Sequence, residues 1–202
     1  MIKMDTRSKM ISGAMDLIRR RGLNATSVRE VVRYTATPRG SIKHHFPNGK
    51  LQLVTEAVVL AGQEVSVPLK RLMESHNSIE GLCIFIDFWR KILQDSHFEA
   101  GCPLLAVASE QYIAEDGNPN LEAEQQLLGH VHTIFQEWQF ILESAMHRDG
   151  ATTTQAKRLA NLIIASIEGT VAMCRAAKNT IALDDVEQEL KLILANALEV
   201  KE

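Results

Sequence analysis

Residues 26–50 read TSVREVVRYTATPRGSIKHHFPNGK, and this stretch decides the fold of the N-terminal part of the chain. Ser27 and Glu30 have the S-x-x-E spacing of a capping box, with Thr26 as an alternative cap. A helix is therefore expected to begin here. Its apolar side consists of valines, and it is expected to end near residues 34–36.

A second short helix is predicted to follow, because Thr37 is a good N-cap and Pro38 suits the first helical position. At 100° per residue, one side of this helix carries Pro38, Ile42, His45 and Phe46. The other side carries small and basic residues: Thr37, Gly40, Ser41 and His44, flanked by Arg39 and Lys43. A helix that buries one side and presents such residues on the other suits the major groove of DNA.

The charge of the chain is divided unevenly along its length. Residues 1–50 contain eleven Lys/Arg and three Asp/Glu, a net charge of +8, whereas the remaining residues carry −11. A basic N-terminal part on an acidic remainder is typical of a protein that approaches a polyanion in one orientation.

Helical periodicity extends through nearly the whole chain, and no segment alternates with a period of two. The sequence predicts an all-α protein of about nine helices. A helix-turn-helix domain (1–50) is linked through a helix at about 49–66 to a larger body (67–202). Pro68 is expected to kink or break the linking helix. The expected helices are approximately 6–21, 27–36, 38–46, 49–66, 78–97, 103–114, 119–148, 153–177 and 183–200.

The predicted DNA contacts follow from the chemistry of the helix-turn-helix. Small Gly40 and Ser41 allow a close approach, and basic Arg39, Lys43 and Lys50 supply charge for phosphates, or a guanine contact in the case of Arg39. Exposed amides at helix N-termini can each face a phosphate. The complete predicted set is Thr26, Ser27, Thr37, Arg39, Gly40, Ser41, Lys43, His44 and Lys50.

Three segments carry a resemblance to a known family. They are KMISGAMDLIRRRGLNATSVREV (residues 9–31), TPRGSIKHHFPNGKLQLV (37–54) and GCPLLAVASEQ (101–111). The first two resemble the DNA-binding domain of TetR-family transcriptional repressors, and the FPNGK and GCPLLAVASEQ motifs are similar to the LmrA/YxaF branch. The family usually has an aromatic residue, often tyrosine, where this chain has Lys43. The resemblance therefore implies a phosphate contact at this position without a stacking ring.

The resemblance also implies a homodimer that binds a palindromic operator and is released when a small hydrophobic effector enters the body. The candidate pocket residues, which are alternatively core residues, are Phe85, Phe88, Trp89, Leu105, Phe135 and Trp138. The candidate dimer interface, alternatively an internal stripe, comprises Leu159, Ile163, Ile167, Leu190, Ile193 and Ala197.

The remaining signals point to few other functions. The three cysteines are far apart and form no metal-binding spacing, which favours a reduced cytoplasmic compartment. The pairs His44–His45 and His130–His132 are spaced too closely along a helix to chelate a metal easily. No apolar run is long enough to predict a membrane span. No metal or cofactor is expected.

Two other function classes stay open at this point. A small helical ligand carrier or enzyme with a basic surface would share the composition, although no nucleophile–base set or Gly-rich phosphate loop supports an enzyme. An adaptor dimer could use the helix at 38–46 to bind an acidic protein. DNA binding that falls steeply with salt would distinguish the preferred function from both.

Overall fold

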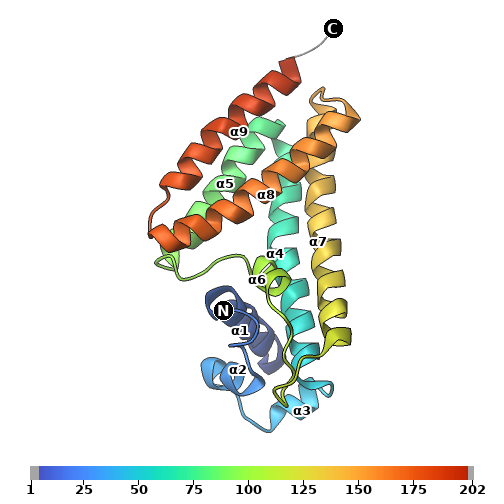
Figure 1. Cartoon of the computed structure of the whole chain (residues 1–202), viewed down its shortest axis with the longest axis vertical. Helices are drawn as coiled ribbons and strands as arrows, with labels where there is room; N and C mark the ends of the chain where they lie inside the picture. Colours follow the sequence, from blue (N-terminus) through green and yellow to red (C-terminus); the bar gives the residue numbers. More distant parts are fainter. Residues whose placement is uncertain (1–4, 200–202) are drawn as a thin grey trace. The chain divides into compact units, whose positions relative to one another are not determined.

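The computed structural model describes residues 5–199, and within them it contains nine α-helices and no strand beyond one isolated bridge between Ile113 and Pro119. The predicted all-α fold is confirmed. Residues 200–202, where the last helix was predicted to end, lie outside the described residues. The helices, shown in Figure 1, are α1 (Thr6–Arg21), α2 (Val28–Thr35), α3 (Ser41–His45), α4 (Gly49–Ser75), α5 (Ser78–Asp95), α6 (Pro103–Ser109), α7 (Leu121–Arg148), α8 (Thr153–Ala177) and α9 (Ile181–Glu199).

The chain forms two compact units that are not continuous in sequence. Unit 1 contains the described residues up to 64 together with 102–133, and unit 2 contains 65–101 together with 134–199. Unit 1 therefore holds α1 to α3, the first part of α4, α6 and the first part of α7. The return of residues 102–133 to the N-terminal helices is a long-range feature that helical periodicity does not reveal.

The core of unit 1 is built on α1, which packs against α2 and α6. The side chain of Asp5 caps α1 by accepting a hydrogen bond from the Ser8 amide at 2.8 Å, and Gly22 ends the helix with a φ of 89°. Glycine adopts this conformation without strain. The fully buried apolar residues include Met10, Ala14, Leu17, Ile18, Val31 and Phe46.

Helix α4 runs without interruption from Gly49 to Ser75, although Pro68 lies inside it. Of the two outcomes expected at Pro68, a kink or a break, the structure excludes the break. Pro68 is exposed to solvent, so the backbone carbonyl that loses its helical donor can be hydrated. Continuous apolar packing on the other side, which includes Val65, Leu69 and Met73, holds the helix together across this position.

Unit 2 is organised around α5, which contacts both α8 and α9, and α8 and α9 also pack on each other. The buried residues of α5 include Leu82, Phe85, Ile86, Trp89 and Leu93. Arg90 extends from α5 to α9, where it pairs with Asp184 and Glu187 at 2.8 Å each. At the start of α8, Thr152 and Gln155 form a reciprocal capping box.

Among the described residues, α8 is the one helix that is long and apolar enough to cross a membrane. Half of its most apolar window is buried inside the protein. A core helix of a helical bundle has the same length and composition, and the contacts of α8 with α5 and α9 account for its hydrophobicity.

Candidate nucleic-acid interface

Helix α2 is held tightly against α1, and this contact orients the segment that follows. A side chain at Gly13 would collide with Thr35, because a Cβ built there lies 2.2 Å from the Thr35 Cγ2 atom. Ser27 caps α2 by accepting a hydrogen bond from the Glu30 amide at 3.2 Å. The Glu30 carboxylate pairs with Arg33. The predicted start of this helix is correct.

The turn between α2 and α3 is longer than the sequence predicts. Ala36 takes a left-handed conformation with a φ of 51°, and its neighbour Thr37 donates its amide to the Val32 carbonyl at 3.1 Å. The Thr37 hydroxyl lies 2.9 Å from that of Thr35 and does not cap α3. A turn closed by the Ser41 amide and the Pro38 carbonyl precedes the helix, which begins at Ser41.

Arg39 and Gly40 therefore lie in the turn that leads into α3, rather than in the helix as predicted. Both are exposed, as are Lys43 and His44, while Thr37 and Ser41 are half-buried. A Cβ added to Gly40 would meet no protein atom within 4 Å. Nothing inside the described part of the protein requires glycine here, which is consistent with the close approach of an external surface.

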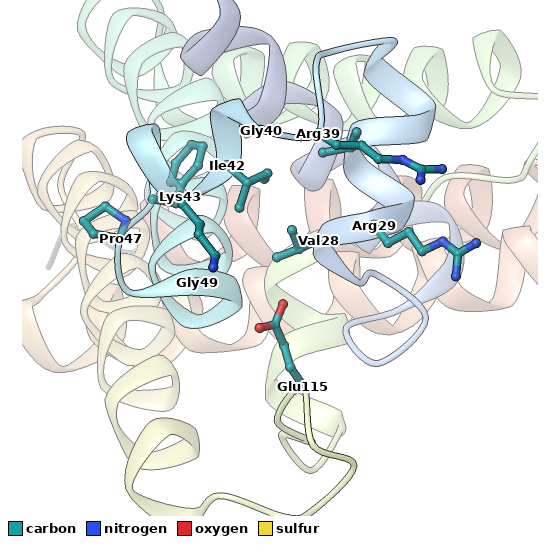
Figure 2. A pocket seen from close by; sticks show the side chains of 11 residues that line it. Val28, Arg29, Arg39, Gly40, Ile42, Lys43, Pro47, Gly49 and Glu115 are labelled. Atoms are coloured by element: carbon teal, nitrogen blue, oxygen red, sulfur yellow. The ribbon is translucent and has the colours of Figure 1, made fainter.

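Arg39, Gly40 and Lys43 border a surface hollow of about 890 Å³, shown in Figure 2. Arg29 from α2, which the sequence analysis did not select, lies beside it. The signal that could have identified it is a basic residue in the first turn of α2, away from the apolar side formed by the valines. The hollow is lined by Val28, Arg29, Val32, Arg39, Gly40, Ile42, Lys43, Phe46, Pro47, Gly49 and Glu115.

Two residues predicted to touch DNA are buried in the structure. Thr26 is only 1% exposed, and its hydroxyl donates to the Gly22 carbonyl at 2.8 Å. Lys50 is 6% exposed; its Nζ donates to the Ile113 carbonyl at 2.8 Å and lies 5.0 Å from the centre of the Tyr112 ring. Burial lowers the pKa of Lys50, and the nearby carboxylates of Glu115 and Glu110 oppose this shift. Neither side chain is presented at the surface.

The candidate pocket residues do not share one cavity. Phe85 and Phe88 line a hollow of about 370 Å³ formed by α4 and α5 in unit 2. Trp89 lies edge-on to both rings, with centroid distances of 6.4 and 5.8 Å. The other aromatic residues form a separate pair, Phe135 with Trp138, whose ring centroids are 5.4 Å apart. Leu105 belongs to unit 1.

Three of the six candidate dimer residues are internal. Ile163 and Ile167 are each 1% exposed and Leu190 is 3% exposed, because this side of α8 and α9 packs within unit 2. Leu159 and Ala197 are half-buried, and Ile193 is exposed. These three buried residues therefore match the alternative expectation of an internal stripe, because they belong to the core of unit 2.

Comparison with known proteins identifies both parts of the chain. Residues 10–57 match the family described as bacterial regulatory proteins, tetR family, and residues 78–189 match the C-terminal domain of LmrA/YxaF-like transcriptional regulators. An HTH-type transcriptional regulator of Mycobacterium tuberculosis strain H37Rv is 32% identical over 188 residues, 93% of each chain. The HTH-type transcriptional regulator LmrA of Bacillus subtilis strain 168 is 27% identical over 180 residues, which cover 89% of this chain and 91% of LmrA.

Solved structures show the same fold. A TetR transcriptional regulator from Legionella pneumophila superposes with a TM-score of 0.79 at 20% identity, over 95% of this chain and 98% of that one. The regulatory protein TetR from Rhodobacter sphaeroides gives 0.77 at 14% identity, over 92% and 96%. The family and these relatives are transcriptional regulators and not enzymes. The chain belongs to the TetR family of DNA-binding transcriptional regulators, in its LmrA/YxaF-like branch.

Proposed function

We propose that this regulator is a repressor that binds a palindromic operator as a homodimer and releases it when a small hydrophobic effector binds. The proposed DNA surface comprises Arg29, Ser27 and the exposed or half-exposed residues Thr37, Arg39, Gly40, Ser41, Lys43 and His44. Its cytoplasmic location follows from this function.

The state of the arginines in unit 1 is the observation that carries the proposed DNA surface. Five of them are paired with acidic side chains: Arg7, Arg19, Arg20, Arg21 and Arg33. The side chains of Arg29, Arg39 and Lys43 border the hollow and make no hydrogen bond or ion pair with any residue from 5 to 199. Because the fold does not use the charge of these exposed cations in ion pairs, they are available to bind DNA phosphates.

The proposed dimer uses the outer side of α8 and α9, which is opposite to their buried stripes. Leu162, Met173 and Leu192 are 42%, 61% and 58% exposed. Between the first two, Gly169 is exposed, and a Cβ built there meets nothing within 4 Å. A side with large apolar residues around a small one suits a second copy of the same pair of helices, which would form a four-helix interface.

The proposed effector site is the hollow beside Phe85 and Phe88. Its lining is mainly apolar, with Arg71 and His76 also contributing. The adjacent Trp89 is 2% exposed, and its Nε1 has no hydrogen-bond partner among the described residues. A buried donor without a partner is costly. Trp89 does not line the hollow, so the apolar lining alone sets the proposed class of effector, a small hydrophobic compound.

The mechanism we propose is a shift between two populations. The dimer presents two recognition segments, and operator binding requires them about 34–36 Å apart, one turn of DNA. An effector that binds better to a differently spaced conformation lowers the population that fits the operator.

The central experiment measures binding of a labelled DNA fragment from upstream of the protein's own gene. The double substitution Arg39→Ala with Lys43→Ala should weaken binding about 100-fold, roughly 3 kcal/mol, and leave the unfolding free energy within about 0.5 kcal/mol. Lys91→Ala is the control, because Lys91 is an exposed base of unit 2 that pairs with Asp95. Equal affinities for the double variant and this control would refute the proposed surface.

The dimer is tested separately by the molar mass in solution. Leu162→Glu combined with Leu192→Glu should convert a dimer into a monomer, since two charges per chain would be buried in the interface. Phe140→Glu is the matched control: Phe140 is 68% exposed on α7, outside the proposed interface. A double variant that stays dimeric would exclude this side of α8 and α9.

A further inference from the structure

The segment of residues 110–120, which we call the strap, connects α6 to α7. It is hydrogen-bonded to the N-terminal part of unit 1. Its first residue, Glu110, accepts hydrogen bonds from the Leu23 amide at 3.0 Å and the Asn24 amide at 3.1 Å. The side chain of Asn24 adds bonds to the Gln111 carbonyl at 2.8 Å and the Ile113 amide at 3.1 Å. This end of the strap is therefore fixed to the loop that precedes α2.

The strap is fixed a second time at the start of α4. The Lys50 ammonium donates to the Ile113 carbonyl and lies over the Tyr112 ring, as described above. Tyr112 is only 3% exposed, and its amide donates to Glu124 of α7 at 2.9 Å. Beyond Ile113 the strap folds back in a tight turn, in which the Ala114 amide donates to the Asn118 carbonyl at 2.9 Å.

The tip of this turn places a carboxylate at the proposed DNA surface. Glu115 is exposed and lines the same hollow as Arg29, Arg39 and Lys43. Figure 2 shows its carboxylate directed into the hollow, while the Arg29 and Arg39 side chains extend away from it. A Cβ built on Gly49 lies 3.6 Å from the Glu115 Oε2 atom, so the carboxylate is next to the first residue of α4. The N-terminus of a long helix favours an anion. Here that anion is the Glu115 carboxylate, and in a DNA complex it would be a phosphate.

We infer that the strap is an autoinhibitory element, in which the Glu115 carboxylate occupies the place of a DNA phosphate at the start of α4. This inference rests on the proposed DNA surface and adds a regulation of that same surface. DNA must displace the tip before a phosphate can reach the start of α4, and the Ile113 carbonyl holds the Lys50 ammonium until then. The strap thereby weakens binding to any DNA and leaves operators with strong base contacts at an advantage.

The test compares three substitutions that each remove one negative charge. Glu115→Gln removes the proposed phosphate mimic. Asp116→Asn changes the neighbouring residue of the tip, whose carboxylate accepts from the Asn118 amide within the turn. Glu122→Gln changes an exposed residue in the first turn of α7, outside the strap. The full-length variants are titrated against labelled random-sequence DNA and against the upstream fragment, at low and at physiological salt.

Glu115→Gln should bind both DNAs roughly three- to ten-fold more tightly at low salt, with most of the gain lost at physiological salt because of screening. Asp116→Asn should give a smaller gain, and Glu122→Gln less than about two-fold by the same charge argument. The thermal unfolding temperature of Glu115→Gln should fall only slightly, because an exposed carboxylate at a helix N-terminus contributes little to stability. A purely structural role for this carboxylate would lower stability without tightening DNA binding.

The two proposals fail in different ways. Suppose that the wild-type protein binds DNA and the Arg39 and Lys43 substitutions abolish this binding. If the DNA affinity of Glu115→Gln is then equal to or lower than that of Glu122→Gln, the strap inference alone is overturned. If the wild type does not bind DNA, or those basic substitutions have no effect, the proposed DNA surface itself is overturned.

Discussion

The recognition segment (residues 37–44) and the strap (residues 110–120) meet at the same hollow but are held there differently. The recognition segment makes mostly local bonds, such as Thr37 to Val32, and its basic side chains point to solvent without partners in the described structure. The strap is fixed by bonds between residues 63 to 89 positions apart in sequence. Substitutions in the recognition segment should therefore change DNA binding. Substitutions at the bonded base of the strap should first change stability, whereas substitution of its exposed tip at Glu115 should affect DNA binding.

The largest effect expected in this comparison comes from Glu110→Ala at the base of the strap. The backbone amides of Leu23 and Asn24 would lose their acceptor, and the part-buried Leu23 amide has little access to water. Leaving such donors unsatisfied costs roughly 1–3 kcal/mol, so the unfolding free energy should fall by about 2 kcal/mol.

Chemical denaturation checks this value, and Glu122→Ala provides the control because Glu122 is an exposed acid in the same unit. A loss for Glu110→Ala no larger than the control would show that the strap is not anchored as described. Gly22→Ala should be similarly damaging, since a Cβ there lies 2.2 Å from the Glu110 Oε1 atom and Gly22 has a φ of 89°.

The contrast also explains what the sequence could predict. The start of α2 after Ser27 followed from local capping chemistry, and the extent of α1 from Thr6 followed from helical periodicity. The exposed residues of the recognition segment followed from composition and family resemblance. The conformation of these segments depends on residues that are only a few positions away in the sequence. The start of α3 was missed because Thr37 bonds to Thr35 instead of capping the helix, a choice between two local partners.

The strap could not be predicted for the opposite reason. Nothing near Glu110 in sequence indicates that it accepts bonds from residues 23 and 24, and nothing near Lys50 indicates a partner at residue 113. Lys50 was assigned to the DNA surface from its motif, whereas a long-range contact buries it. The same limitation applied to α8 and α9, where periodicity identified a buried stripe but not which neighbour covers it.

An intermediate effect is expected for Arg39→Lys in the recognition segment. Lysine keeps the charge but loses the planar fork that can bind a guanine in two places. Affinity for the upstream fragment should fall about ten-fold, roughly 1.4 kcal/mol, with affinity for random DNA and stability unchanged. Arg29→Lys, at the same hollow, is the matched control, and an equal loss on random DNA would indicate that Arg39 contacts only phosphate.

The smallest effect is expected for Gly40→Ala, which asks whether the recognition segment approaches DNA closely. Gly40 has φ −68° and ψ −18°, which alanine adopts readily, and the added methyl group meets no protein atom within 4 Å. Stability should change by less than about 0.5 kcal/mol, because reduced freedom of the unfolded chain offsets the weaker N-cap. DNA affinity should nevertheless fall a few-fold, about 0.5–1 kcal/mol, since the methyl group would separate the segment from the groove.

Gly129→Ala is the control for this substitution. Gly129 lies within α7 in the same unit, also with open space around its Cβ position. Alanine there should stabilise the protein by about 1 kcal/mol through helix propensity and leave DNA binding as it was. Unchanged DNA affinity for Gly40→Ala would mean that the backbone at residue 40 stays away from the DNA, and the reading surface would then be limited to the longer side chains of Arg39, Lys43 and His44.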